Sequence, residues 1–197
     1  ERYVVAPKGT PQRSICFEQP ARRDSATVFR LAFRVTTRAQ YFDPEELSKQ
    51  VEPYDTLSEV YRKYTAQRPP HLVFSERIER KARELAGGET DPVRIVSRIY
   101  DWIDDIPWAG AIEYGVIPNI PEYVLDAGHG DCGQVSLLLI AMLRSVGIPA
   151  RWESGWMLHP GHVGLHDWGS VYYEGVGWVP LDISFGKLAA SADPAVR

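Results

Sequence analysis

One stretch decides the fold: residues 130–149, which read GDCGQVSLLLIAMLRSVGIP. Apolar residues recur in it at the spacing of an α-helix, and further apolar residues occupy the remaining faces. The first set is Val135, Leu138, Leu139, Met142, Leu143 and Val146; the second is Leu137, Ile140 and Ala141. A helix that is apolar on nearly all sides must be buried on nearly all sides. The sequence therefore predicts a central helix from Cys132 to Val146, ended by Gly147 and Pro149.

The segments on either side of this helix predict the fold class. Before it, one helix is expected from Ser75 to about Leu85, and another begins at Thr90-Asp91-Pro92 and carries apolar residues to Ile103. After it come three strand candidates, Ala150–Trp156, Leu165–Glu174 and Trp178–Ser184, the last two joined by a hairpin at Gly175 and Gly177. Helices followed by an antiparallel sheet indicate an α+β fold.

The remaining segments predict two domains. Residues 66–197 form the expected core, because Pro69-Pro70 interrupts the chain, and residues 1–65 form an appendage. In the appendage, residues 28–36 alternate apolar side chains with arginines and predict a strand. Two short helices are expected over 44–51 and 56–66, the second capped by Asp55. Residues 109–126 are interpreted as a long irregular loop of the kind that builds a site.

Composition excludes several classes of protein. The chain has 197 residues, of which 44% are hydrophobic and 24% charged, and its formal net charge is −4. These are values of a globular protein, and no run of Lys or Arg supports binding to nucleic acid. The longest nearly apolar stretch, residues 135–143, is far shorter than the roughly 20 residues that span a bilayer. Only Cys16 and Cys132 could form a disulfide, so a disulfide-built scaffold is excluded.

Cys132 is the first candidate for chemistry. It follows Gly130-Asp131 at the first turn of the predicted central helix. The amino end of a helix carries partial positive charge and free N–H groups, which favour a thiolate over a thiol and can hold an oxyanion. We therefore expect a nucleophile with a lowered pKa, labelled by iodoacetamide at pH 6 far faster than Cys16. A small buried hydrophobic residue is the alternative interpretation.

His166 and Asp182 are the available base and orienting acid. A cysteine nucleophile needs a base, and the base needs an acceptor that fixes its tautomer. His166 lies on one predicted strand and Asp182 on the next. A two-residue loop between these strands would put them on opposite faces. We therefore predict a three-residue loop, Glu174-Gly175-Val176, or a bulge, which places Asp182 opposite Trp168 and diagonal to His166.

These motifs together resemble the bacterial transglutaminase-like superfamily. The resemblance rests on Gly130-Asp131-Cys132 with its apolar helix, Gly147-Ile148-Pro149-Ala150-Arg151, His166-Asp167-Trp168, and Gly177-Trp178-Val179-Pro180-Leu181-Asp182. It covers about residues 70–186 and implies a papain-like core. It also implies Cys132 as nucleophile, His166 as general base and acid, and Asp182 as the residue that orients His166. The implied reaction is acyl transfer through a thioester, to water or to an amine, on a peptide or protein amide. No cofactor is implied.

Four further residues are candidates for the oxyanion site or for substrate binding. The resemblance implies a second oxyanion donor upstream of the nucleophile, and Trp108 and Tyr114 are both available. Trp168, next to His166 on its strand face, is interpreted either as sheet packing or as a wall of the substrate site. We expect His162 to lie closer to the site than His71. Gln134 is treated as a polar helix residue without a special role.

Two other functions remain open from the sequence. One is a catalytically silent member of the family that serves as a binding or structural module. The other is a zinc protein that uses His129-x-x-Cys132 and His159-x-x-His162, although a second cysteine ligand is missing nearby. No signal peptide is evident, and the family resemblance favours an exported or periplasmic protein. The oligomeric state is not predicted.

Overall fold

The computed structural model divides into two compact units, residues 1–41 and 42–197. It describes residues 2–10, 14–36, 38, 40–110, 113–159 and 162–185, without the side chains of residues 158, 159 and 162. The two helices expected over residues 44–66 belong to the larger unit. Among the described residues, no helix has both the length and the apolar character needed to cross a membrane.

The smaller unit contains a two-stranded antiparallel hairpin, β1 (Arg2–Val5) and β2 (Ile15–Glu18). The predicted strand over residues 28–36 is wrong, because the described residues of this segment have no regular secondary structure. Its apolar side chains are exposed, although the ring of Phe29 lies 5.7 Å from that of Phe17. Alternation alone does not make a strand, since a neighbouring strand must supply the hydrogen bonds.

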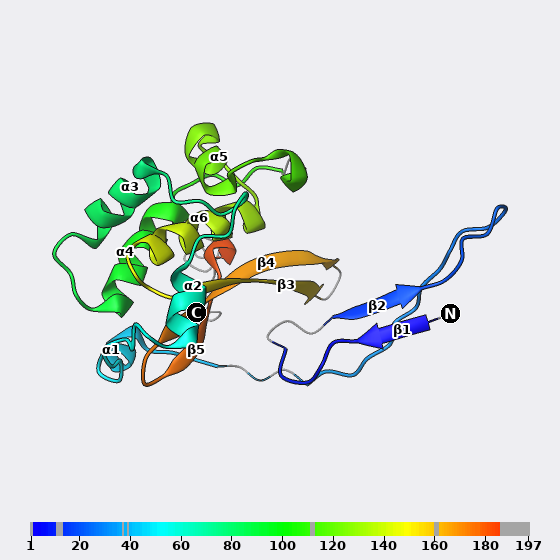
Figure 1. Ribbon diagram of the computed structural model, residues 1–197, viewed down its shortest axis with the longest axis horizontal. Coiled ribbons are helices and arrows are strands. Elements are labelled where there is room, and N and C mark those ends of the chain that lie inside the picture. Colours follow the sequence, from blue (N-terminus) through cyan, green and yellow to red (C-terminus); the bar gives the residue numbers. More distant parts are fainter. Residues whose placement is uncertain are drawn as a thin grey trace. The chain divides into compact units, whose positions relative to one another are not determined.

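The larger unit is a mixed α+β fold, as predicted (Figure 1). Its helices are α1 (Pro44–Ser48), α2 (Glu59–Thr65), α3 (Glu76–Ala86), α4 (Pro92–Asp104), α5 (Ile120–Ala127) and α6 (Cys132–Ser145). It also contains two short 3₁₀ turns among the described residues, η1 (Tyr114–Val116) between α4 and α5 and η2 (Ile183–Phe185) after β5. The sheet has the order β3 (Ala150–His159), β4 (His162–Tyr173), β5 (Gly177–Leu181), all antiparallel.

Helix α6 is central, as its sequence predicts. It contacts α3, α4 and α5 as well as strands β3 and β4. Leu138, Ala141 and Leu143 have no solvent exposure, which places the core along this helix. The two helices expected before it begin and end at the predicted residues. Ser75 caps α3, Asp91 caps α4, and Gly87 ends α3 with a positive φ.

Two local predictions before α6 need correction. The segment interpreted as a long loop contains α5, which starts with Pro121 in its first turn and ends at the left-handed Gly128. Ile120 and Val124, four residues apart, are buried, so the helix signals were present but short. For α2 the cap is Ser58, because the carboxylate of Asp55 accepts a hydrogen bond from the backbone of Leu57 instead.

The loop between β4 and β5 has three residues, as predicted. Tyr173 pairs with Gly177, which leaves residues 174–176 as the connection. The ladder ends at Gly169 opposite Leu181, so the next position sets Trp168 against Asp182. This register brings Asp182 to the same side of the sheet as His166.

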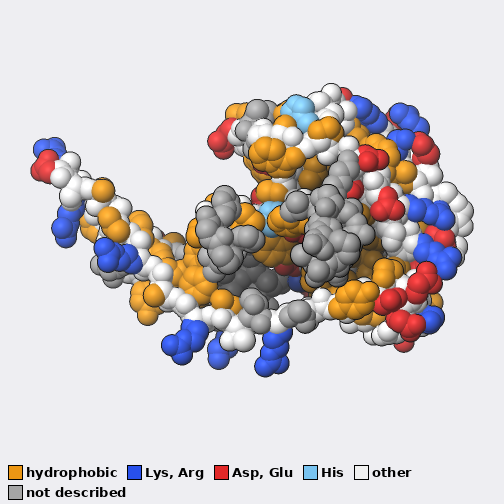
Figure 2. Space-filling view, turned by 180° about the vertical axis from the view of Figure 1, so that it is seen from behind, with side chains coloured by type: hydrophobic (Ala, Val, Ile, Leu, Met, Phe, Trp, Pro, Cys, Tyr) orange, Lys and Arg blue, Asp and Glu red, His pale blue; other side chains and the backbone are white. Residues whose placement is uncertain are grey.

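The surface of the larger unit shows mixed charge. On the face drawn in Figure 2, its basic and acidic side chains are interspersed. This distribution agrees with the small net charge of the whole chain.

Candidate active site

Cys132 is the first residue of α6, where the local sequence builds a capping box. The Asp131 carboxylate accepts a hydrogen bond from the Gln134 N–H at 2.9 Å, and the Gln134 side chain accepts one from the Asp131 N–H at 3.1 Å. Gln134 thus has a structural role. The cap leaves the N–H groups of Cys132 and Gly133 as the free donors at this helix end. Cys132 is a free, half-buried thiol, and Cys16 is also free.

The thiol lies beside a carboxylate. The Cys132 Sγ is 3.9 Å from the Asp167 Oδ2 on β4. Burial raises the pKa of Cys132, and the charges of Asp167 and Asp131 raise it further. The backbone N–H groups of Asp167 and Gly133 act in the opposite direction without reversing the shift. The expectation of a lowered thiol pKa is therefore wrong in direction, because burial and two carboxylates raise it. Fast labelling at pH 6 stays an untested prediction.

The structure brings His166 and Asp182 together. The His166 Nε2 lies 2.7 Å from the Asp182 Oδ2. The other carboxylate oxygen, Oδ1, accepts a hydrogen bond from the Ser184 N–H at 2.9 Å. The Tyr100 hydroxyl donates to the Asp182 backbone carbonyl at 2.8 Å, and burial raises the pKa of Tyr100 to about 12, so this donor stays protonated. Asp182 is thus fixed, and its bond to Nε2 leaves the His166 Nδ1 for proton transfer.

Cys132 and His166 are not joined by a hydrogen bond in the structure. Among the described side chains, the thiol's hydrogen-bond partner is Asp167, the residue that follows His166 on β4. Successive side chains of a strand point to opposite faces, so Asp167 and His166 approach the site from different sides of β4. For a proton to pass from Cys132 to His166, the two groups would have to come into hydrogen-bond contact, as catalytic groups of free enzymes often do only with substrate.

Tyr114 lies at the start of α6, as one of the two predicted donors. Its hydroxyl donates a hydrogen bond to the Asp131 carboxylate. Burial is the largest cause that raises the Tyr114 pKa, and this hydrogen bond is the next. Gly133 makes room for the arrangement. A Cβ at Gly133 would meet the Tyr114 hydroxyl and would lie 2.7 Å from the Asp167 Oδ2. Only a residue without a side chain lets both groups approach the helix start.

The other predicted residues fall in different places. The Trp108 backbone pairs with Gly130 just before the nucleophile, but 73% of its surface is exposed. Trp168 stacks on His166, with ring centroids 6.0 Å apart and planes 24° from parallel. His162 starts β4, and its side chain is outside the described part of the chain. Asp167 is the neighbour of the thiol that sequence reasoning missed, because its position next to His166 suggested the opposite sheet face.

The zinc interpretation finds no support in the described part of the chain. No group of three His, Cys, Asp or Glu side chains there is placed to hold a metal ion. His129 packs its ring against Tyr123, with centroids 6.4 Å apart. The side chain of His159, like that of His162, is not among those described.

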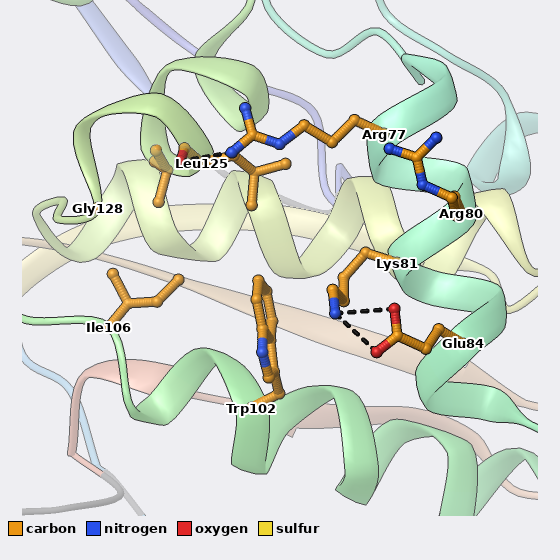
Figure 3. Close-up of a pocket in the computed structure, with 9 residues that line it drawn as sticks. Arg77, Arg80, Lys81, Glu84, Trp102, Ile106, Leu125 and Gly128 are labelled. Carbon is orange, nitrogen blue, oxygen red and sulfur yellow. Dashed lines mark hydrogen bonds and ion pairs between the residues drawn. The ribbon is translucent and has the colours of Figure 1, made fainter.

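The hollow drawn in Figure 3 is separate from these residues. It measures about 370 Å³, and its walls come from α3, α4, α5 and the segments that follow α4 and α5. Two of its cations have partners in the wall: Lys81 lies 2.8 Å from Glu84, and Arg77 donates to the Leu125 carbonyl at 2.8 Å. None of the predicted site residues lines it.

Comparison with known structures supports the fold. The chain matches a protein from Cytophaga hutchinsonii described as a candidate cysteine protease, with a TM-score of 0.59 and 19% identity over 71% of this chain and 47% of that one. It also matches the periplasmic domain of TgpA from Pseudomonas aeruginosa, with a TM-score of 0.50 and 23% identity over 68% of this chain and 50% of that one. At these identities the matches show a shared fold alone.

Comparison of sequences identifies the family. The chain is 23% identical over 130 residues to the uncharacterized protein YebA of Bacillus subtilis strain 168, covering 56% of this chain and 18% of that protein. The chain thus spans half or less of the length of these relatives. The family model described as the transglutaminase-like superfamily core matches residues 79–183, just over half of the chain, from within α3 to just past Asp182. The chain belongs to the transglutaminase-like superfamily.

Proposed function

We propose that this protein is a cysteine-dependent amide hydrolase or acyltransferase that acts on peptide-like substrates. One observation carries the proposal. The His166 Nε2 lies 2.7 Å from the Asp182 Oδ2, and the residue after His166 on β4, Asp167, contacts the Cys132 thiol. A nucleophile, a base and an orienting acid are thus presented by one helix start and one sheet.

The first half of the reaction forms a thioester. The His166 Nδ1 takes the proton of the Cys132 thiol as the sulfur attacks the substrate carbonyl carbon. The raised pKa of the resting thiol makes this base necessary, because little thiolate forms without it. The N–H of Cys132, which the cap does not use, is the donor available to the oxyanion. The imidazolium then gives its proton to the leaving nitrogen as the carbon–nitrogen bond breaks, and an amine departs.

The second half restores the thiol. Water or an amine attacks the thioester carbonyl while His166 takes its proton. The carbon–sulfur bond breaks, the sulfur receives the proton back from His166, and the acid or the new amide leaves. The Asp182 carboxylate, which is hydrogen-bonded to Nε2, stabilises the imidazolium in both halves.

The proposal extends to location and substrate class. An amide of a peptide or protein is the substrate class that fits this chemistry. We also propose that the protein acts outside the cytoplasm, and the similarity to a periplasmic domain of TgpA supports this location.

The test is a peptide-library assay read by mass spectrometry, with and without an added primary amine. The wild type is expected to cleave peptides or to join the amine to them, and Cys132→Ala is expected to do neither. Asp182→Asn should lower kcat by roughly 10²- to 10⁴-fold, because the imidazole loses its tautomer and its counter-charge. Cys16→Ser is the matched control, since the exposed Cys16 lies in the other unit and should leave the activity unchanged. Activity that survives Cys132→Ala contradicts the proposal.

A silent binding module is the second candidate function. The missing hydrogen bond between Cys132 and His166 in the resting structure is the observation that favours it. A folded wild type that neither cleaves any library peptide nor joins the amine to one would support this function instead.

A further inference from the structure

A small hollow lies beside the candidate catalytic residues. It measures about 170 Å³, and we call it the Trp108 hollow. Its wall includes Gly130, two residues before the nucleophile, and Ile183, which follows Asp182. It therefore lies where the backbone leading to the thiol meets the backbone that leaves the orienting acid.

The lining of the Trp108 hollow is mainly apolar. Ile103, Ile106, Pro107, Val135 and Ile183 contribute to it, together with Trp108. An apolar cavity of about 150 Å³ accepts a molecule the size of benzene, so this volume suits one branched aliphatic or small aromatic side chain. Asp104 also lines the hollow, and its carboxylate disfavours an acidic occupant.

Ser184 is the second polar residue that lines the hollow. The hydroxyl oxygen of Ser184 is buried and has no hydrogen-bond partner among the described residues. Ser184 lines the hollow, and its backbone N–H holds the Asp182 carboxylate. Buried hydroxyls in proteins nearly always have a partner, so the Ser184 hydroxyl has an unused hydrogen-bonding capacity at the edge of the hollow.

Trp108 lines the hollow with a fixed backbone and an exposed ring. Its backbone is fixed, because the Ala109 N–H donates to the Gly130 carbonyl at 3.1 Å and the Gly130 N–H donates to the Pro107 carbonyl at 3.2 Å. Its side chain remains 73% exposed above an apolar hollow. A large ring in this position has most of its apolar surface available to cover a bound side chain.

We propose that the Trp108 hollow is the subsite for an uncharged aliphatic side chain on the acyl part of the substrate. The inference rests on the proposed function and adds the side chain that the enzyme prefers. The acyl part is favoured because the hollow adjoins Gly130, on the chain segment that carries the attacking sulfur.

The experiment measures how fast Cys132 is alkylated by three matched probes, the chloromethyl ketones of N-acetyl-leucine, N-acetyl-glycine and N-acetyl-glutamate. In each, the sulfur displaces chloride from the probe's methylene carbon, and mass spectrometry separates Cys132 from Cys16. Each rate is divided by the rate with iodoacetamide, which removes differences in thiol reactivity. The leucine probe is expected to exceed the glycine probe by roughly 10- to 100-fold, and the glutamate probe to be no faster than the glycine probe.

Variants of two residues that line the Trp108 hollow test whether the leucine side chain binds there. Ser184→Leu fills the hollow from one wall, and Ile106→Phe fills it from another; either should bring the leucine-to-glycine ratio close to one. Ser184→Ala keeps the space, so it should preserve the ratio. A wild-type ratio near one, or a ratio unchanged in both filled variants after circular dichroism shows that they fold, overturns the inference.

The proposed function fails by a different result. If the wild type neither cleaves peptides nor transfers acyl groups while the leucine preference and its loss in the filled variants hold, the subsite stands without the catalysis. If catalysis depends on Cys132 but the probe ratio is near one, the catalysis stands and the subsite is refuted.

Discussion

Replacing Asp167 by asparagine should make the Cys132 thiol more acidic. The Asp167 carboxylate lies 3.9 Å from the sulfur, and its charge opposes a thiolate there. Two like charges about 4 Å apart repel by roughly 1 kcal/mol in water and roughly 4 kcal/mol at an effective dielectric constant of 20. Both groups are partly exposed, so the lower part of this range applies. About 1.4 kcal/mol corresponds to a tenfold change in an equilibrium constant, so we expect Asp167→Asn to lower the Cys132 pKa and to raise the thiolate fraction by roughly tenfold.

The assay is the rate of iodoacetamide labelling of Cys132 as a function of pH. The background carries Cys16→Ser, so that Cys132 is the single thiol in the chain. The midpoint of the rate profile should move to lower pH in Asp167→Asn, and well below the midpoint the rate should rise by roughly tenfold, because the thiolate fraction does. Asp101→Asn is the matched control: it removes one carboxylate from the exposed side of α4 and should leave the midpoint in place. A folded Asp167→Asn protein whose midpoint stays the same or rises would refute the account of the raised pKa.

Two further variants test the packing around the nucleophile. Gly133→Ala should destabilise the protein by about 1–3 kcal/mol and alter Cys132 labelling, because the new Cβ meets the Tyr114 hydroxyl. Gly88→Ala is the control, because a Cβ there lies in open space. Equal thermal midpoints for the two variants would count against the tight approach at Gly133. Leu138→Ala should lower the free energy of unfolding by about 2–5 kcal/mol in urea titrations, since Leu138 is fully buried on α6. Leu57→Ala is the control and should change this free energy little, because Leu57 is exposed. A small effect at Leu138 would contradict the central position of the helix.

The sequence was most informative where one strong local signal coincided with one strong packing requirement. The apolar faces of residues 132–146 could only be buried, and the structure confirms α6 over nearly the same residues. The caps at Ser75 and Asp91 are single side chains that satisfy backbone N–H groups of their own helix, so no distant contact is needed to predict them. The three-residue loop between β4 and β5 followed from the parity of strand faces once His166 and Asp182 were paired.

Failure came where the deciding partner was distant in sequence. The segment 28–36 has the alternation of a strand, but its described residues form none. The thiol pKa depends on burial and on Asp167, 35 residues away, and the sequence argument from the helix start includes neither. Helix α5 was missed for a different reason: with eight residues it offers only about two turns of periodicity.

The start of α6 serves two requirements that oppose each other. Asp131 caps the helix and accepts the Tyr114 hydroxyl, which places the thiol where its neighbouring N–H groups can act. The same negative charge, together with Asp167, raises the Cys132 pKa. A helix start with an uncharged cap would hold more thiolate at rest, but it would lose the favourable interaction between the cap's charge and the helix dipole. Both carboxylates thus favour the protonated thiol at rest. In the proposed reaction the thiolate would then have to form with the help of His166, which Asp182 holds by a hydrogen bond, and the helix end alone would not suffice.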